Sequence, residues 1–497
     1  MLAAGPPDST PDQARVSRRG VLGLLGAGGW AATILTAHPA SAAGLAAPAA
    51  LPRPRTPLAA ADDQLASIPR TLAATFRGTG PVTPTFGPGY VAVRWHGPAG
   101  APGGGQAGPA IRLRVPNGTV GTWSPLSVGC PAERDDRMGS ETSEHAVLTG
   151  IRPGGHPVGY ELRMPPGASA VVSTALNTTS GPIQQVRVPI VTAQDVLAAV
   201  AGLARTIEAL SGSPRSAPAS ERLSAALPTR GGPAPATSTP RPTRLAAVVS
   251  PGPIPAPSSP VQSGPAPAGP VPAQPSRPAL PPALPPALPS GPLPLRYLPR
   301  AAWGADEALR LNPATGQPWQ TTYHPGQVIT VHHTVTPNVD PDPAATVRAV
   351  YHFHTVDRGW ADIGYHFLID QAGTLYEGRW SGTDGIPAHR PDGQVVTGAH
   401  VGGFNAGNIG VALLGDLRTE PPTVAARRSL VLVLLALTGA HQLDPLGRVA
   451  YVNPASAARR DVPTIGGHRD WMATECPGGS LYSMLPGIRS DVSNSLV

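Results

Sequence analysis

Lysine is absent from this chain of 497 residues, and cysteine and aromatic residues are scarce. Its two cysteines, Cys130 and Cys476, are too few for a framework of disulfide bonds. Only 22 residues are Phe, Trp or Tyr, and none lies between Tyr160 and Tyr297, which excludes a large core across that stretch. Fifteen of the 22 fall within 296–497. We therefore expect one well-packed C-terminal domain and one smaller N-terminal domain.

The positive charge of the chain, formally +7, lies outside the expected C-terminal domain. Residues 296–497 carry 15 Arg against 17 Asp plus Glu, whereas 212–295 carry six Arg and one acidic residue. Arginines scattered through Pro- and Ala-rich sequence do not form the continuous basic face that phosphates require. We therefore expect no nucleic-acid partner.

The N-terminus has the pattern of an export signal. Two arginines in the stretch SRRGVL precede a Gly-rich apolar run over 21–37, and small residues follow at 40–42. This pattern is similar to a twin-arginine signal peptide, cleaved after Ala42. The run is shorter than the ~20 apolar residues of a membrane span, as is a second run over 430–440. We expect a signal peptide at 1–42, a secreted or cell-wall-associated protein, and no stable membrane insertion after cleavage.

Beyond an Ala/Pro-rich tail at 43–68, the sequence changes to short stretches in which apolar and polar residues alternate. The stretches YVAVRW (90–95), IRLRV (111–115) and GYELRM (159–164) predict half-buried strands. Because Gly and Pro separate them, we expect a small β-sandwich over 69–190.

A helix and a linker are predicted between this region and the C-terminal domain. Apolar residues recur at helical spacing along 193–210, which predicts a helix within 191–211. Residues 212–295 are rich in proline and end in a Pro-Ala-Leu-Pro array, which predicts a disordered linker. At ~3.1 Å per residue, such a chain could hold two domains apart by up to roughly 250 Å.

Two sequence clusters in the C-terminal domain combine residues that bind metals. His332 lies in the predicted strand VITVHHT, whose period puts it on one face with Thr330 and Thr334. His468 and Cys476 lie eight residues apart in a Gly-flanked loop. Two imidazoles and a thiolate suit tetrahedral zinc and leave a fourth position for water, as catalytic zinc sites do. Spacing alone leaves open a structural histidine and an unpaired buried cysteine.

From residue 299 to the C-terminus, about 200 residues, the sequence resembles the peptidoglycan recognition protein family, the type 2 N-acetylmuramoyl-L-alanine amidases. This resemblance implies an α/β fold with a central mixed sheet flanked by helices. It rests on six ordered motifs, which are VHHT (331–334), DIGYHF (362–367), YEGR (376–379), GAHVGGFN (398–405), IGV (409–411) and HRDWMATECPG (468–478).

The resemblance also implies roles for individual residues. The zinc ion (Zn2+) would be bound by His332, His468 and Cys476, with Tyr365 as the catalytic tyrosine and Thr474 in a helper role. Asp470 is a candidate for supporting the ligands. Four further residues would line the substrate groove, although each could equally be structural: Tyr376, Arg379, His400 and Asn405.

The activity that the resemblance implies is zinc-dependent hydrolysis of the amide bond between N-acetylmuramic acid and L-alanine in peptidoglycan, by a monomeric enzyme. The alternative is a module that binds peptidoglycan without cutting it. Family members of that kind typically lack the zinc-binding cysteine, so Cys476 favours an enzyme. A zinc protease is disfavoured because the chain has no His-Glu-x-x-His helix.

The region 69–190 has a possible binding role of its own. Trp95 and Trp123 lie beside turn residues, where an exposed aromatic ring can stack on a sugar. The alternative is that both belong to the core of a small domain. A long linker is useful when the domains at its two ends bind different targets, because anchoring one domain to the wall raises the effective substrate concentration for the other. We therefore expect 69–190 to bind a cell-envelope polymer without hydrolysing it.

Overall fold

The computed structural model describes residues 63–98, 108–126, 144–151, 157–211 and 295–496. The predicted signal peptide, residues 43–62 of the predicted tail at 43–68 and all but the last residue of the linker at 212–295 lie outside the described residues. Residues 64–68, predicted as part of the tail, belong to a strand.

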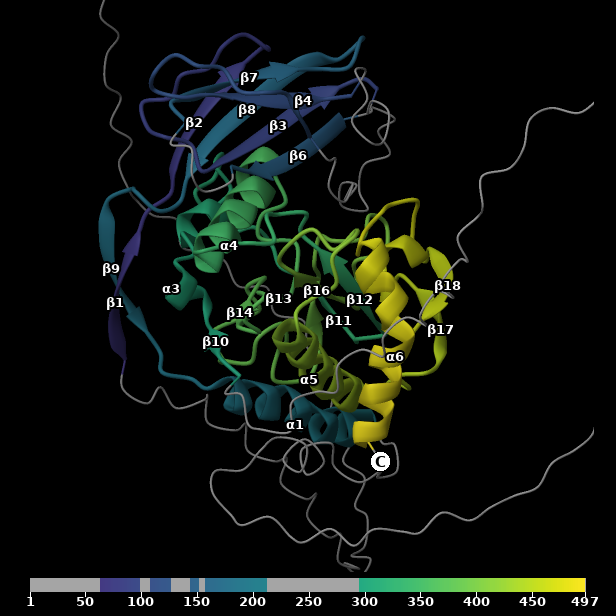
Figure 1. The fold of residues 1–497 in the computed structure, drawn as a ribbon. Coiled ribbons are helices and arrows are strands. Elements are labelled where there is room, and N and C mark those ends of the chain that lie inside the picture. The colour runs from purple at the N-terminus through teal and green to yellow at the C-terminus, as the bar shows by residue number, and fades with distance from the viewer. Residues whose placement is uncertain (1–62, 99–107, 127–143, 152–156, 212–294, 497) are drawn as a thin grey trace, which may run out of the picture. The chain divides into compact units, whose positions relative to one another are not determined.

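A six-stranded sheet forms the centre of the C-terminal domain (Figure 1). Strand β16 lies between β13 and β12 and runs parallel to both, β19 runs parallel to β12, and β14 runs antiparallel to β13. This mixed sheet confirms the α/β fold class. In order, the strands are β10 (Tyr297–Leu298), β14 (Leu375–Glu377), β13 (Phe367–Ile369), β16 (Asn408–Leu413), β12 (Val328–His333) and β19 (Ile465–Gly467).

Helices cover both faces of this sheet, which explains why every residue of β12 and β16 is buried. On one face, α5 (Val424–His441), α6 (Gly479–Leu496) and α1 (Ala193–Ser211) pack on apolar residues such as Val331. On the other face, α4 (Pro343–His352) continues into a π-helical turn, η2 (Phe353–Asp357). His332 pairs with Ala412 of the face that α4 covers, so its side chain points to that side.

Helix α5 is the only described helix that is long and apolar enough to cross a membrane, but two thirds of it is buried in the domain. The Thr423 side chain caps its N-terminus by accepting from the Ala426 amide, and Asp342 caps α4 in the same way. Smaller elements complete the domain: α3 (Arg300–Trp303), η1 (Glu307–Arg310), η3 (His468–Asp470), and the strand pairs β11 (Tyr323–His324) with β15 (Val395–Val396) and β17 (Arg448–Val452) with β18 (Arg459–Pro463).

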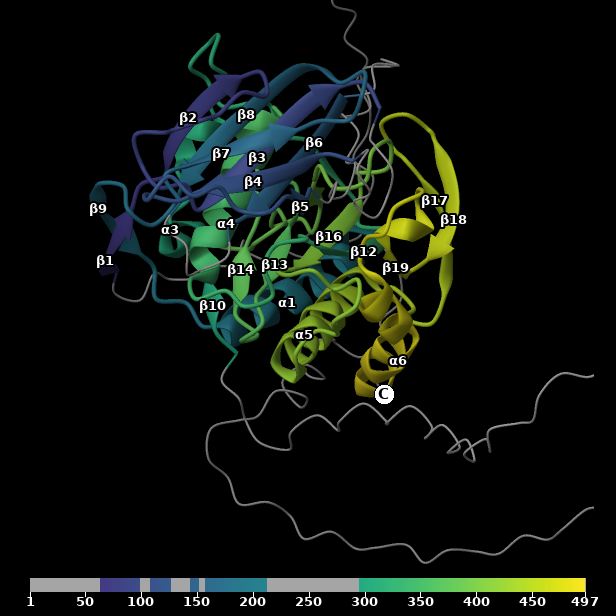
Figure 2. The same cartoon turned by 45° about the horizontal axis from the view of Figure 1, so that its top comes forward.

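Two antiparallel sheets form the N-terminal region and enclose a core of their own (Figure 2). One sheet has the order β2 (Leu72–Arg77), β8 (Ser169–Asn177), β3 (Tyr90–His96) and β6 (Glu144–Gly150). The other has the order β5 (Ser124–Pro125), β4 (Ala110–Arg114) and β7 (Gly159–Arg163). A separate ribbon pairs β1 (Gln64–Pro69) with β9 (Ile183–Val188).

Strand β3, in the interior of the four-stranded sheet, packs on both of its faces, whereas the sequence predicted half-buried strands. Along β3, Val91 and Val93 face the core between the two sheets, but Ala92 packs with residues of α4. Helix α1 likewise packs on α5. The described N-terminal residues therefore contact the C-terminal domain, and the predicted separation by the linker does not hold for them.

The structure places Trp95 in the core, one of the two alternatives for the tryptophans of this region, and gives Trp123 a different setting. Trp95 has no exposed surface and lies in the core between the sheets, where its indole N–H donates to the Pro98 carbonyl. Trp123 is half-buried, and two guanidinium groups lie over its ring, that of Arg112 at 4.6 Å and that of Arg163 at 5.1 Å from the ring centroid. Trp95 therefore cannot stack on a sugar, because this small domain has few aromatic residues and Trp95 is part of its core.

Candidate metal centre

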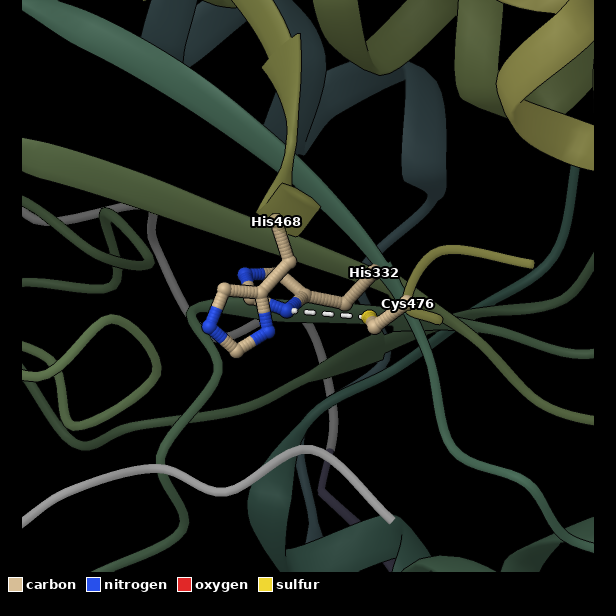
Figure 3. Close-up of side chains that lie close together, drawn as sticks. All are labelled: His332, His468 and Cys476. Carbon is tan, nitrogen blue, oxygen red and sulfur yellow. Dashed lines mark hydrogen bonds between the residues drawn. The ribbon is translucent and has the colours of Figure 1, made fainter. Parts of the chain in front are cut away.

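The predicted metal ligands meet at the ends of two neighbouring parallel strands. Strands β12 and β19 pair with Val331 opposite Gly467, so the next residues, His332 and His468, lie at the same level. Their ring centroids are 4.7 Å apart. The loop after His468 returns Cys476 to the same point, where its sulfur lies 3.5 Å from His332 Nδ1. The three ligand atoms lie within 4.8 Å of one another, and the side chains point toward one another in Figure 3.

Asp470 holds the turn that carries His468. One carboxylate oxygen accepts from the Gly467 amide at 2.7 Å, and the other accepts from the Tyr482 hydroxyl at 2.6 Å. A Cβ at Gly467 would lie 2.8 Å from both Pro477 and Tyr482, so no larger residue fits there. The loop is closed by the Arg469 amide, which donates to the Cys476 carbonyl. Asp470 thus supports the backbone of the site and does not contact the imidazole.

The chemistry of this cluster fits a metal ion. The His468 ring has no exposed surface, yet neither of its nitrogens has a hydrogen-bond partner among the residues that the structure describes. Burying an unpaired polar group costs free energy, and coordination would remove that cost. The Cys476 sulfur accepts from the His333 amide at 3.5 Å, a contact that holds it beside the two imidazoles. Two imidazoles and a thiolate are the donor set that zinc prefers.

A chain of hydrogen bonds sets the orientation of the His332 ring. His400 Nε2 lies 3.0 Å from the Asn408 carbonyl, which can only accept, so Nε2 carries the proton and Nδ1 is the acceptor. His332 Nε2 then donates to His400 Nδ1 at 3.0 Å, which leaves the lone pair of His332 Nδ1 facing Cys476. Burial lowers the pKa of His400 well below its ordinary value, so the ring stays neutral. His400 is therefore a positioning residue for His332.

The two residues predicted to assist catalysis adjoin different members of the cluster, Tyr365 next to His332 and Thr474 next to Cys476. Tyr365, two residues before β13, is 6% exposed, and its ring centroid is 5.2 Å from that of His332. Thr474 is half-buried, and its hydroxyl oxygen accepts from the Cys476 amide at 3.2 Å. Next to it, Glu475 points outward and pairs with Arg418. Of the two, Tyr365 borders a pocket beside the cluster.

The residues predicted to line the substrate groove have other partners in the structure. Tyr376 is buried in the core and donates its hydroxyl proton to Asp370, so it does not border the pocket. Asn405 is also buried, and its side-chain oxygen accepts from two amides of its own turn. Arg379 donates to the carbonyls of Trp360 and Ile363. Of the four, only His400 borders the pocket, and its two ring nitrogens are already engaged.

Sequence reasoning missed two parts of this pocket. His354 on η2 lies against Tyr365 and Trp360, and its Nδ1 accepts from the Gly364 amide at 3.0 Å. Nothing in the sequence distinguishes it from an ordinary helix-face histidine. The second part is strand β6 of the N-terminal sheet, which no C-terminal motif could reveal. The lining residues are Ala146, Val147, Leu148, His333, Thr334, Val350, Phe353, His354, Arg358, Trp360, Tyr365, Ala399 and His400.

Comparisons with known proteins agree with the resemblance. A family model described as N-acetylmuramoyl-L-alanine amidase matches residues 322–479. Peptidoglycan-recognition protein LB of Drosophila melanogaster is 33% identical over 192 residues, which cover 38% of this chain and 66% of that protein. N-acetylmuramoyl-L-alanine amidase of Homo sapiens is 31% identical over 191 residues, covering 38% of this chain and 27% of the human one.

A third relative is covered over most of its length. Peptidoglycan recognition protein 1 of Bos indicus is 31% identical over 170 residues, which cover 33% of this chain and 74% of the bovine protein. The chain thus spans about two thirds of the length of the fly protein and about a quarter of that of the human amidase. It belongs to the family of peptidoglycan recognition proteins and N-acetylmuramoyl-L-alanine amidases.

Proposed function

We propose that this chain is a zinc-dependent enzyme that hydrolyses the amide bond between N-acetylmuramic acid and L-alanine in peptidoglycan. The observation that carries the proposal is the buried cluster of His332, His468 and Cys476, in which both ring nitrogens of His468 lack a hydrogen-bond partner among the described residues. Tyr365 lies beside this cluster and borders a pocket. A binding module would need neither the thiolate nor a polar group buried in this way.

The protein residues would have separate tasks in this reaction. Zinc held by the cluster supplies Lewis acidity, which polarises a carbonyl and lowers the pKa of water. His400, fixed by the Asn408 carbonyl, keeps the His332 lone pair directed at the cluster. Asp470 holds the turn of His468. Because all three ligands are buried, the site excludes bulk water and strengthens electrostatic interactions with the substrate.

Tyr365 would stabilise the negative charge that develops on the carbonyl oxygen. Its ring packs beside His332 and His354 at centroid distances of 5.2 and 5.4 Å, which restricts where its hydroxyl can lie. A hydroxyl aimed at a developing oxyanion contributes about 10²–10³-fold to the rate. Thr474 is neutral and bonded to the Cys476 amide, so its part is to hold the ligand loop and to hydrogen-bond substrate or water.

The proposal includes where the protein acts. Export through the twin-arginine route would deliver a folded monomer to the cell wall, in keeping with the paired arginines and small residues of the N-terminal sequence. Replacing Arg18 and Arg19 by Gln should retain the protein in the cytoplasm with 1–42 uncleaved. Secretion of the double variant at the wild-type level would contradict this route.

A digest of defined peptidoglycans tests the enzymatic proposal directly. The full chain, loaded with zinc, should release free stem peptides beginning with L-alanine and leave intact glycan strands, as read by mass spectrometry. Chelation should stop the release, and zinc should restore it. A protein that holds no zinc and releases no peptide, but still sediments with cell walls, would instead be the binding module.

A further inference from the structure

We propose that strand β6 of the N-terminal sheet forms one wall of the substrate pocket and that Ala146 determines what fits beside the scissile bond. The identity of the substrate rests on the proposed function, but the wall is a feature of the structure. Ala146, Val147 and Leu148 of β6 border the same pocket as Tyr365 and His400. The N-terminal region would then be part of the active site.

The alternation of side chains along β6 gives Ala146 its place. Val147 is buried in the core between the two N-terminal sheets. Its neighbours therefore point to the opposite face, where Leu148 packs with Tyr365, Val350 and other residues of the C-terminal domain. Ala146 lies on that same face and is half-buried. Because its side chain is one methyl group, it leaves the pocket open at this point.

Buried polar contacts fix this wall in place. The Arg348 guanidinium of α4 donates to the Thr178 carbonyl at 2.8 Å, and the Thr174 hydroxyl donates to Asp357 of η2 at 2.6 Å. Separating the two regions would leave apolar surface exposed, including Ala92 and Leu176, which lie in the same cluster as Tyr351 of α4. A sheet that is anchored through both apolar and polar groups is a permanent part of the pocket.

The chemistry of the pocket near β6 suits small apolar groups. Ala146 and Leu148 on one side face a pocket whose lining also includes Val350 of α4 and Phe353 of η2. The bond that the proposed function cuts is flanked by methyl groups on the lactyl ether, the N-acetyl group and the alanine. Apolar linings of this kind discriminate by size, and one extra carbon there changes specificity about 10–200-fold. Larger side chains at Ala146 should therefore exclude the substrate.

The test compares Ala146→Val and Ala146→Leu with the control Ala73→Leu. Ala73 is exposed on β2, at the opposite edge of the same sheet, so the control adds the same side chain to the same fold. In the zinc-loaded full chain, KM for muramyl dipeptide is measured. Its Kd is measured by calorimetry in a Tyr365→Phe background, where hydrolysis is slowed. We expect both constants to rise ~10-fold for Val and further for Leu, with zinc content and melting temperature unchanged.

Equal affinities of wild type, both Ala146 variants and the control for muramyl dipeptide would refute the proposal that β6 forms a wall of the substrate pocket. The smaller Val variant decides the matter if Leu impairs folding, because its branched side chain is well tolerated in strands. The two proposals fail separately. A graded loss of affinity without any hydrolysis would refute the amidase activity but support β6 as a wall of the pocket. Hydrolysis that does not change with the residue at 146 would support the amidase activity and refute the role of β6.

Discussion

The substitution Gly410→Ala tests whether His400 positions His332, a predicted metal ligand. Gly410 lies on β16 beneath the His400 ring, where an added Cβ would be 2.7 Å from both Cγ and Cδ2 and 2.9 Å from Nδ1. The ring cannot give way without loss, since its nitrogens are each held at 3.0 Å, by Asn408 and by His332. The backbone is fixed as well, because β16 pairs with strands on both sides.

The expected size of the effect follows from this contact. Ordinary carbon–carbon contacts lie at about 3.5–4.0 Å, so the His400 ring must shift by roughly 1 Å. Overpacking of a buried site costs about 1–3 kcal/mol of the free energy of unfolding. A shift of that size also breaks the hydrogen bond to His332, and losing a residue that orients a ligand lowers metal affinity about 10–100-fold. Gly410→Ala should show both losses.

Competition with a chelator measures the zinc affinity, and guanidinium unfolding measures the stability. The control is Gly487→Ala in α6, where no atom lies within 4 Å of the added Cβ. Its zinc affinity should not change, and alanine should stabilise the helix by about 0.5–1 kcal/mol. A double variant with His400→Ala should bind zinc no worse than His400→Ala alone. Wild-type zinc affinity in Gly410→Ala, or fully additive losses in the double variant, would refute the reasoning.

Three further predictions concern the proposed ligand Cys476, the proposed catalytic residue Tyr365 and His389, which lies outside the cluster. Cys476→Ser should hold almost no zinc by metal analysis and lose hydrolysis while keeping its circular dichroism spectrum; turnover under metal-scrubbed conditions would contradict this. Tyr365→Phe should keep its zinc but lose ~10²-fold or more in kcat, and an unchanged kcat would leave the residue a core tyrosine. Burial lowers the pKa of His389 to about 4, so the unfolded chain binds more protons below pH ~6.5. The stabilisation is complete above pH ~6.5, and about 3 kcal/mol of it is lost as the pH falls toward 4. His389→Gln should flatten this part of the pH dependence measured by urea unfolding, and an identical slope would remove His389 as its source.

The sheet and the cluster could be predicted because their signals are local. A strand period places His332 and Val331 on opposite faces, and the structure has Val331 on the α5 face and His332 on the α4 face. Both faces of the sheet are covered by helices, so every residue of β12 is buried. The alternation along the strand therefore decides only which helices each side chain contacts. What the period could not supply is the register of β12 with β19, which brings His468 level with His332. The resemblance implied only that His332 and His468 bind the same ion, and no strand was predicted at 465–467.

Contact of the predicted groove residues with substrate stays a prediction, because motifs do not say which polar atoms are satisfied internally. Tyr376 and Asn405 belong to motifs of the family, but their hydrogen-bond partners are an aspartate six residues away and two amides of the same turn. His400 lies in the same motif as Asn405, and its partner is the predicted metal ligand His332, 68 residues away. A polar residue in a motif therefore predicts proximity to the site more securely than contact with substrate.

The contact between the two regions was missed because the linker suggested distance. The free energy of closing a loop grows only with the logarithm of its length, so doubling a linker costs about 0.6 kcal/mol. Residues 212–295 can thus join α1 to β10 on the same domain at little cost, even though that stretch could reach much further. What decides between contact and separation is the surface at each end. Here the face of β3 that points toward the C-terminal domain carries Ala92, a residue small enough for α4 to approach closely. The size of this side chain is therefore a better predictor of contact between the two regions than the length of the linker.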